Sequence, residues 1–308
     1  MTDPVERAEA ILRDTCGDRV RRSFSMAPLT TFRIGGAAAL YLEPESDADL
    51  AAAGRAIEAS ALPFLVIGKG SNLLVSDEGF PGIVLRLGRS YRWAARDGDR
   101  LRAGGSMPLP ALSGVALRHG LAGLAFGVAI PATVGGAVRM NAGAHGGSMS
   151  DVVTSVEVVH LSGGRSESIP GADAGFAYRR SSLPVDAVVT GVTVTLKPGD
   201  PAAIRAEMDA ARDWRRRTQP LAEPNCGSVF KNPPGDHAAR LIEAAGLKGH
   251  RVGGAQISMK HANFIVAEPG ARAADVLSLI RAVRDAVEED AGTRLEPEVH
   301  LVGAFDAG

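Results

Sequence analysis

Apolar residues recur along the chain with two different periods, and the two alternate along its length. Stretches with a spacing of about three to four residues predict helices, and short runs rich in β-branched residues predict strands. The helical stretches are 46–60, 106–120, 200–219, 236–246 and 274–290. The extended runs are 63–68, 82–87, a hairpin at 155–169, 186–198, 251–257, 263–268 and 298–303. This alternation is typical of an α/β or α+β protein.

The predicted helices carry their own start and stop signals. Ser46 precedes the first helix and Asp49 follows three residues later, which is the pattern of an N-cap. The second helix has prolines in its first turn and Gly120 just past its end. Asp200 and Pro201 start the longest helix. These signals place the helix boundaries independently of the hydrophobic pattern.

A proline-bearing segment, QPLAEPNCG at 219–227, interrupts the pattern after the longest helix. About a hundred residues of mixed helix and strand follow it, which is enough for a domain of its own. We therefore predict three parts. Two subdomains, 1–87 and 88–200, form a larger unit, and 201–308 forms a smaller α+β domain whose last strand returns to that unit.

Composition narrows the class of protein. The chain has 308 residues, 45% of them hydrophobic, and a formal net charge of -1, which is the balance of a globular protein without a nucleic-acid-binding surface. Two distant cysteines, Cys16 and Cys226, allow no disulfide framework and no zinc spacing, and the histidines form no metal motif. Without a signal sequence or a long apolar run, we expect a cytoplasmic protein with no resident metal and no membrane partner.

Two glycine-rich segments indicate a bound phosphate group. They are VIGKGSNLLVSDEGF at 66–80 and GVAIPATVGGAVRMNAGAHGG at 127–147. Glycine allows positive φ and lets a pyrophosphate approach bare N–H groups. Neither segment contains G-x-G-x-x-G, and Lys69 is followed by Gly70, so the Rossmann and Walker loops are excluded. The alternative is that both segments are tight turns.

Seven segments in order resemble one family. They are TTFRIGGAA, IGKGSNLLVSDEGFPG, GVAIPATVGGAVRMNAGAHGG, FAYRRSSLP, CGSVFKNPPGDHAARLIEAAGLKG, KHANFIV and LEPEVHLVG, spanning about Thr30 to Gly303. The chain is thereby identified as similar to the UDP-N-acetylenolpyruvoylglucosamine reductases, in their form without a tyrosine-bearing lid. The resemblance implies an α+β fold: a vanillyl-alcohol-oxidase (PCMH) type FAD-binding domain in two subdomains, plus a smaller C-terminal substrate domain.

The resemblance also implies the reaction and its cofactors. Members of this family use NADPH and non-covalent FAD to reduce UDP-N-acetylglucosamine enolpyruvate to UDP-N-acetylmuramate. The reaction serves peptidoglycan precursor synthesis, and with it cell-wall biogenesis, cell shape and cell division. The residues that the resemblance assigns to FAD are Gly68, Lys69, Gly70, Ser71, Asn72, Leu73, Ile130, Pro131, Thr133, Gly135, Gly136, Asn141, Gly143 and Ala144.

Three residues match the family's catalytic positions. Arg179 would hold the substrate carboxylate and stabilise an enolate, a task suited to a planar, permanently charged guanidinium. Ser228 corresponds to the proton donor at C2, and Glu298 to a carboxyl group that assists at the enol. Neighbouring Arg180 and Glu296 are the alternatives, and motif position favours Arg179 and Glu298.

The expected substrate contacts are Tyr178, Lys231, Asn232 and His261. Lys231 and Asn232 have an equally compatible alternative, which is a purely structural role. In that role they belong to a polar loop that enters a helix capped by Asp236. His261 and Asn263 alternate on a strand, so both are expected at the cleft, with a structural histidine as the alternative. Arg139 either reaches the FAD phosphates or points to solvent. Rival functions are a flavin oxidase of the same fold and a non-catalytic flavin- or UDP-sugar-binding regulator.

Overall fold

The computed structural model describes residues 3–305 of the chain. By its internal contacts the chain divides into two compact units, each assembled from separate stretches. The first unit comprises Met1–Ser23, Ala39–Lys69 and Gly82–Trp214, and the second comprises Phe24–Ala38, Gly70–Pro81 and Arg215–Gly308. The two units are described separately below.

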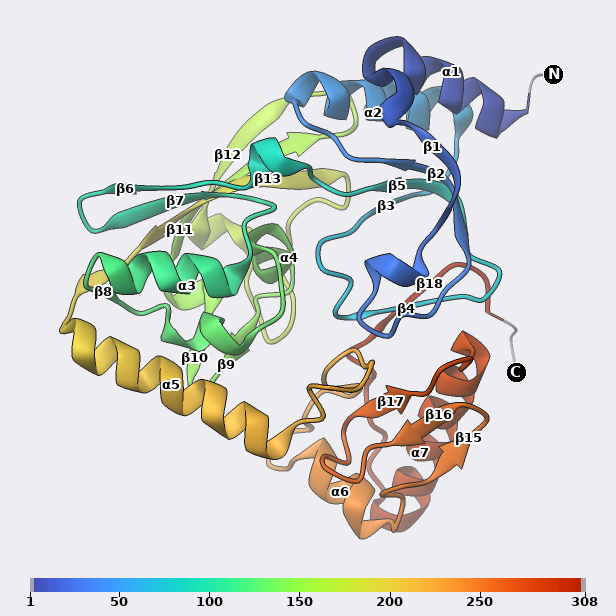
Figure 1. Cartoon of the computed structure of the whole chain (residues 1–308), viewed down its shortest axis with the longest axis vertical. Helices are drawn as coiled ribbons and strands as arrows, with labels where there is room; N and C mark the ends of the chain where they lie inside the picture. The colour runs from blue at the N-terminus through green and yellow to red at the C-terminus, as the bar shows by residue number, and fades with distance from the viewer. Residues whose placement is uncertain (1–2, 306–308) are drawn as a thin grey trace. The chain divides into compact units, whose positions relative to one another are not determined.

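The N-terminal part of the first unit contains two helices and a sheet. Helix α1 (Pro4–Cys16) and helix α2 (Asp47–Ser60) lie side by side (Figure 1). The predicted Ser46 cap is confirmed, since its side chain accepts the Asp49 N–H at 3.2 Å. A four-stranded sheet has the order β1-β2-β5-β3. Its strands are β1 (Arg21–Ser25), β2 (Ala37–Leu42), β3 (Phe64–Val66) and β5 (Phe80–Leu85).

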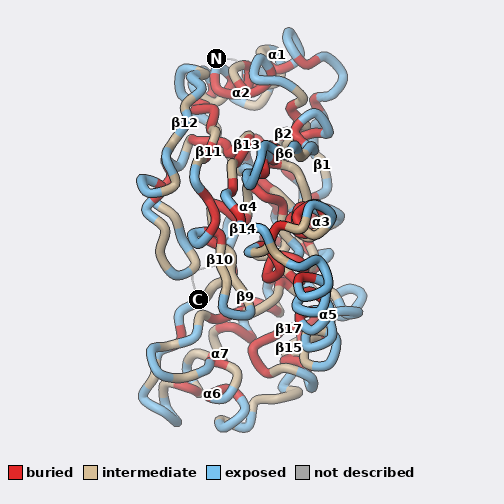
Figure 2. Tube along the Cα trace, turned by 90° about the vertical axis from the view of Figure 1, so that its left-hand side faces the viewer, coloured by how far each residue is buried: buried red, intermediate tan, exposed pale blue. Residues whose placement is uncertain are grey.

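A five-stranded antiparallel sheet forms the centre of the first unit, in the order β12-β11-β13-β7-β6. Figure 2 shows β11 and β13 largely buried, which follows from their β-branched, apolar sequences. The hairpin predicted at 155–169 is β11 paired with β12. The strands are β6 (Ala94–Asp97), β7 (Arg100–Gly104), β11 (Val153–His160), β12 (Ser166–Pro170) and β13 (Ala187–Thr195).

Helices and short strands complete the first unit. Helix α5 begins with Asp200 accepting the Ala202 N–H at 3.0 Å, and buries Ile204 and Met208 against the turn at 125–129. The remaining elements are α3 (Leu109–Arg118), α4 (Val134–Arg139), α5 (Pro201–Thr218), β8 (Leu121–Ala122), β9 (Gly143–Ala144), β10 (Gly147–Ser148) and β14 (Lys197–Pro198).

The second unit packs two helices on a small antiparallel sheet of order β15-β16-β17 (Figure 1). Leu241 on α6 and Ile280 on α7 belong to its core, together with Phe230 and Phe32. Strand β18 pairs with β4 in parallel. The elements are β4 (Leu73–Val75), α6 (Ala238–Ala244), β15 (Arg251–Val252), β16 (Ala255–Ile257), β17 (Ile265–Ala267), α7 (Ala273–Ala291) and β18 (His300–Val302).

The structure differs from the sequence-based expectations in several elements, since helix α1 and strands β1, β2, β6 and β7 were not predicted. Helix α6 has His237 at its N-cap, and Asp236 accepts the His237 N–H and pairs with Arg240, so the helix is not capped by Asp236. Helix α4 was not predicted, because six residues rich in glycine carry no helical signal. The division at 87 and 200 stays a prediction, since the two units are discontinuous in sequence. No helix within residues 3–305 is both long and apolar enough to cross a membrane.

Candidate active site

The first glycine-rich segment presents a run of backbone N–H groups. In the described part of the chain, the N–H groups of Gly68, Lys69, Gly70, Ser71 and Asn72 donate to no protein acceptor. Gly70 has φ +61°, and a Cβ there would lie 2.1 Å from a backbone carbonyl oxygen. Successive unpaired N–H groups in a tight turn form an anion-binding concavity. This segment therefore offers N–H donors suited to an anion such as a pyrophosphate, and its contact with FAD stays a prediction.

The second glycine-rich segment is built differently. Thr133 caps α4 by accepting the Gly136 N–H at 3.3 Å, and the Gly135 N–H donates to Gly105 O at 2.9 Å. The Val134 N–H is likewise bonded to Met107 O. The expectation of bare N–H groups is therefore wrong for the start of α4. Its glycines permit close packing, since a Cβ on Gly135 would be 3.1 Å from two sheet carbonyls.

The two glycine-rich segments contact each other in the first unit. A Cβ on Gly68 would lie 2.5 Å from Thr133 Oγ1, so the first segment needs glycine to pass the cap of α4. Further along, buried Asn141 accepts the Ser150 N–H at 2.9 Å and donates to Ala177 O at 3.0 Å. Its side chain is thus engaged within the protein. The other predicted FAD residues in these segments are exposed Lys69 and Pro131 and half-buried Ser71, Leu73, Ile130, Gly143 and Ala144.

Arg179 lies in a two-residue turn. Ala177 and Arg180 exchange backbone hydrogen bonds of 3.0 and 3.2 Å around Tyr178 and Arg179. Arg179 has φ +58°, an unusual conformation for a residue with a side chain. Its guanidinium lies 4.9 Å from the centre of the Tyr178 ring, and Tyr178 is more than half exposed. The turn therefore presents a cation and an aromatic ring together.

Ser228 and Glu298 are neighbours in the second unit, although seventy residues separate them in sequence. The Glu298 N–H donates to Val229 O at 2.7 Å, directly after Ser228. Both side chains are half-buried. Burial raises the pKa of the Cys226 thiol, and the Glu298 charge acts in the same direction, so the carboxyl group is close to this segment. The structure thus pairs the backbone segments that carry Ser228 and Glu298, and the catalytic roles of the two side chains stay predictions.

Two asparagines hold this pair in place. The buried Asn263 side chain accepts the Phe230 N–H at 2.9 Å and donates to Phe230 O at 2.8 Å. Its predicted place facing the cleft is wrong, because both polar atoms are used on the backbone next to Ser228. Asn72 donates to Glu298 O at 2.9 Å, a supporting role that its glycine-rich motif did not reveal.

The residues after Ser228 have structural partners. Lys231 pairs with exposed Glu296 through its ammonium group, and its N–H donates to Glu296 O. Asn232 Oδ1 accepts the Ala238 N–H at 3.1 Å, so it caps the first turn of α6. The choice of Glu298 over Glu296 is consistent with these contacts. Contact of Lys231 and Asn232 with substrate stays a prediction.

His261 is half-buried against the Phe264 ring, with centroids 4.7 Å apart. Its Nδ1 accepts the Asn263 N–H at 3.2 Å, which leaves Nε2 as the donor of the neutral ring. Burial, followed by the charge of Lys248, lowers the pKa of His261. The ring is therefore neutral near pH 7 and serves as a hydrogen-bond donor.

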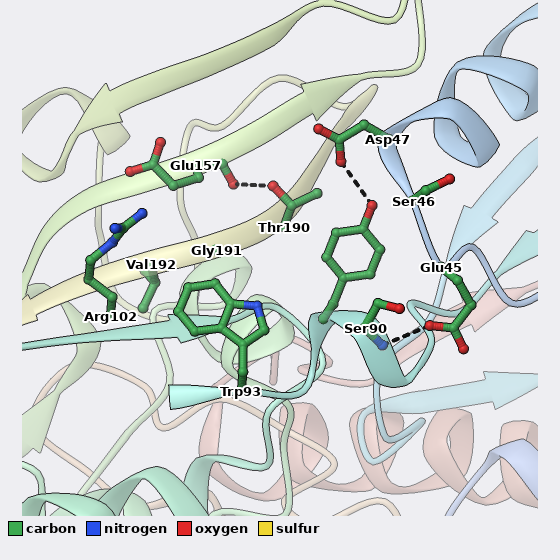
Figure 3. Close-up of a pocket in the computed structure, with 11 residues that line it drawn as sticks. Glu45, Ser46, Asp47, Ser90, Trp93, Arg102, Glu157, Thr190, Gly191 and Val192 are labelled. Atoms are coloured by element: carbon green, nitrogen blue, oxygen red, sulfur yellow. Dashed lines mark hydrogen bonds between the residues drawn. The ribbon is translucent and has the colours of Figure 1, made fainter. Parts of the chain in front are cut away.

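A surface pocket of about 270 Å³ in the first unit does not contain these residues. Trp93, Arg102 and Tyr91 line it with several carboxylates (Figure 3). Glu45 already accepts the Ser90 N–H at 2.7 Å, and Asp47 accepts the Tyr91 hydroxyl at 2.9 Å. Because its acids are satisfied by the protein, the pocket offers no chemistry comparable to that of the candidate site.

Comparison with known proteins first identifies the class of protein. A family model described as "FAD binding domain" matches residues 38–167. A solved structure of a Phl p 4 variant, described as a glucose oxidase, has a TM-score of 0.51 to this chain at 15% sequence identity. The match covers 69% of this chain and 50% of that one. At this low identity the similarity shows the fold alone. The chain is an FAD-dependent oxidoreductase with the predicted vanillyl-alcohol-oxidase type of FAD-binding domain.

The particular family follows from closer relatives. A model described as "UDP-N-acetylenolpyruvoylglucosamine reductase, C-terminal domain" matches residues 219–302. A reductase of that name from Anaeromyxobacter sp. is 49% identical, over 94% of this chain and 90% of the relative. The crystal structure of the enzyme from Thermus caldophilus is 40% identical, with a TM-score of 0.80 over 92% of this chain and 99% of that one. The chain belongs to the UDP-N-acetylenolpyruvoylglucosamine reductase family.

Proposed function

We propose that the protein reduces UDP-N-acetylglucosamine enolpyruvate to UDP-N-acetylmuramate, with NADPH as the hydride donor and FAD as the bound cofactor. The observation that carries the proposal is the backbone pairing that holds Ser228 beside Glu298 in a chain of this family. We assign delivery of a proton to the carbon atom that gains negative charge to the Ser228 hydroxyl, with the Glu298 carboxyl group assisting at the enol.

The glycine-rich segments support binding of FAD. The N–H groups of 68–72 are available to its pyrophosphate, and the cap of α4 borders them at Gly68. When bound, FAD supplies the hydride that is added at C3 of the enolpyruvyl group. The other predicted contacts in 130–144 are part of this proposal.

The protein's own residues manage the charge that develops at C2. Arg179 binds the adjacent carboxylate and stabilises the enolate, since a guanidinium donates two parallel hydrogen bonds and keeps its charge at any working pH. Ser228 then donates its proton to C2. We assign assistance at the enol to the carboxyl group of Glu298, whose backbone N–H and C=O bind Val229 and Asn72.

The remaining contacts concern the rest of the substrate. Tyr178, Lys231, Asn232 and His261 are assigned to the nucleotide and sugar, and the neutral His261 ring suits donation to a phosphate or hydroxyl oxygen. Since the substrate is a cytoplasmic cell-wall precursor, we expect the protein to work in the cytoplasm.

Steady-state turnover tests the proposal. Purified protein saturated with FAD should oxidise NADPH only when the enolpyruvyl sugar nucleotide is added, and mass spectrometry should show a product heavier by two hydrogens. UDP-N-acetylglucosamine is the matched control, because it lacks the double bond. NADPH oxidation that is the same with both sugars, or that depends on oxygen, would contradict the proposal.

A further inference from the structure

The segment that follows Arg179 has little regular structure of its own. Between the turn at 177–180 and the start of β13 at Ala187, the chain forms neither helix nor strand. The position of this segment, here called the 177–187 loop, is set by backbone hydrogen bonds of Ser182 and Asp186, by buried Leu183 and by side chains that bind its backbone. Because Arg179 lies within the loop, the same contacts determine where its guanidinium points.

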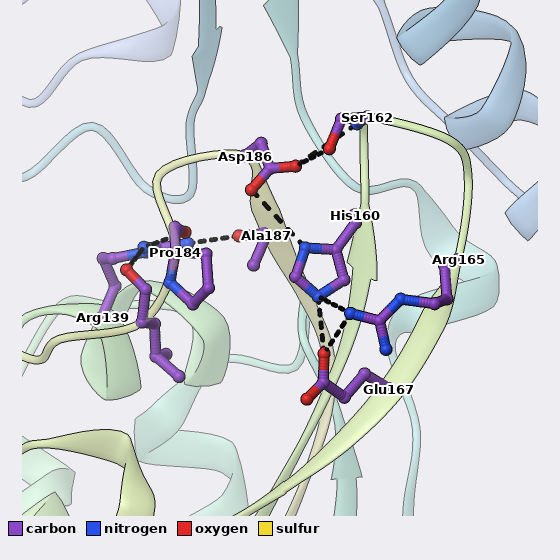
Figure 4. Close-up of polar contacts among 9 residues, drawn as sticks. Arg139, His160, Ser162, Arg165, Glu167, Pro184, Asp186 and Ala187 are labelled. Carbon is purple, nitrogen blue, oxygen red and sulfur yellow. Dashed lines mark hydrogen bonds and ion pairs between the residues drawn. The ribbon is translucent and has the colours of Figure 1, made fainter.

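Arg139, the last residue of α4, binds the far half of the loop. One terminal nitrogen donates to Leu183 O at 2.9 Å and to Pro184 O at 2.8 Å, and the other donates to Ala187 O (Figure 4). A guanidinium suits this task, because its donors lie in one plane and point in fixed directions. The expectation that Arg139 points to solvent is therefore wrong, and its contact with the FAD phosphates stays a prediction.

The electrostatics of Arg139 fit a structural cation. Burial lowers the pKa of its guanidinium, and the charge of Asp186 acts in the opposite direction. Asp186 accepts the Ser162 hydroxyl and lies 3.5 Å from His160 Nδ1, while His160 Nε2 pairs with Glu167 (Figure 4). Three carbonyl dipoles compensate the partial burial of this guanidinium, a group that is not deprotonated in proteins.

Two further hydrogen bonds attach the first half of the 177–187 loop to residues 139 and 141. The Ser181 hydroxyl donates to the backbone carbonyl of Arg139 at 2.9 Å. Asn141, two residues further on, donates to Ala177 O at 3.0 Å. Arg179 lies midway between these attachments, and its positive φ shows that its surroundings impose the backbone conformation.

We propose that Arg139 is a positioning residue for catalysis: it fixes the 177–187 loop so that the Arg179 guanidinium meets the substrate carboxylate. The inference rests on the proposed function, because it assigns Arg139 an effect that operates through Arg179. It also links the glycine-rich segment at the flavin to the residue that stabilises the enolate.

The test separates the two half-reactions. Arg139→Met should leave reduction of the flavin by NADPH within about 3-fold, and slow reoxidation by the enolpyruvyl sugar nucleotide by about 10- to 100-fold, since displacing a catalytic group by an ångström has effects of this size. Arg139→Lys should lie between, because one ammonium cannot serve three carbonyls in a plane. Arg165→Met, which removes an exposed arginine bound to Glu167, is the control and should leave both rates unchanged.

A double-mutant cycle decides whether the effect runs through Arg179. In an Arg179→Met background, adding Arg139→Met should slow reoxidation further by less than about 3-fold, because the group being positioned is gone. A full additional loss in that background would overturn the inference, as would an unchanged reoxidation rate in Arg139→Met. If Arg139→Met does not fold, Arg139→Lys and Ser181→Ala enter the same cycle. Wild-type protein that is not reoxidised by the sugar would instead refute the proposed function.

Discussion

Replacing Asn263 by leucine tests how the site beside Ser228 is held. The two side chains have the same branching and the same number of heavy atoms, so the change removes polar atoms without opening a cavity. It leaves the Phe230 N–H and C=O, which Asn263 now binds at 2.9 and 2.8 Å, without their partners. Both groups are buried with Phe230, which is 2% exposed, so solvent cannot replace the lost hydrogen bonds.

The expected cost follows from that geometry. A buried backbone group left without a partner costs about 1–3 kcal/mol, so two such groups cost about 2–6 kcal/mol of unfolding free energy. Asn232→Leu is the matched control, because Asn232 is exposed and makes one hydrogen bond, to the Ala238 N–H. Loss of such a cap costs about 1 kcal/mol.

Urea unfolding at a fixed, saturating FAD concentration measures both variants, since bound ligand adds to apparent stability. Hydrogen exchange at 229–231 locates the effect, and the Phe230 amide should lose protection in Asn263→Leu alone. Equal losses of stability in the two variants, or a Phe230 amide that stays protected, would refute the claim that Asn263 holds this segment.

Three other changes have defined outcomes. Burial raises the pKa of Asp49, but hydrogen bonds from Arg19 outweigh it and lower that pKa from 3.8 to about 2. The ionised carboxylate therefore stabilises the fold above pH 4, and this stabilisation is lost as pH falls from about 4 to 2. In an acid titration, the unfolding free energy of Asp49→Asn should fall by about 2 kcal/mol less than that of the wild type over this range. Gly70→Ala should release FAD on gel filtration, because its Cβ meets a backbone carbonyl at 2.1 Å, whereas Gly98→Ala, with similar positive φ and open space, should retain it. Ser228→Ala should keep flavin reduction by NADPH but slow product formation by about 100-fold or more, measured by rapid quench.

Local chemistry made much of the fold predictable. The start of α2 follows from Ser46 and the start of α5 from Asp200, because each cap satisfies N–H groups only a few residues away. The hairpin of β11 and β12 likewise follows from alternation and a nearby turn. Such interactions join residues that are close in sequence, so they can be predicted without knowing how the rest of the chain folds.

The supports of the candidate site could not be predicted in that way. Asn263 binds Phe230 across 33 positions, and Asn72 binds Glu298 across 226. Arg139 uses carbonyl groups, which every residue has, so the sequence does not indicate which of them meet a guanidinium. For the same reason α4 could not be predicted, because its backbone N–H groups bind the carbonyl groups of residues 105 and 107, which belong to no recognisable motif. Sequence motifs therefore identify the reacting side chains, whereas the residues that hold those side chains in position are known only from the folded structure.

An anaerobic titration of the bound flavin tests the central claim most directly. Purified protein is given one equivalent of NADPH and then UDP-N-acetylglucosamine enolpyruvate, while the flavin absorbance is recorded. We predict that NADPH bleaches the oxidised flavin band and that the sugar nucleotide alone restores it, with UDP-N-acetylmuramate as product. A band that bleaches but returns only on admission of oxygen would contradict the account, and protein that binds no flavin would refute the assignment of the glycine-rich segments.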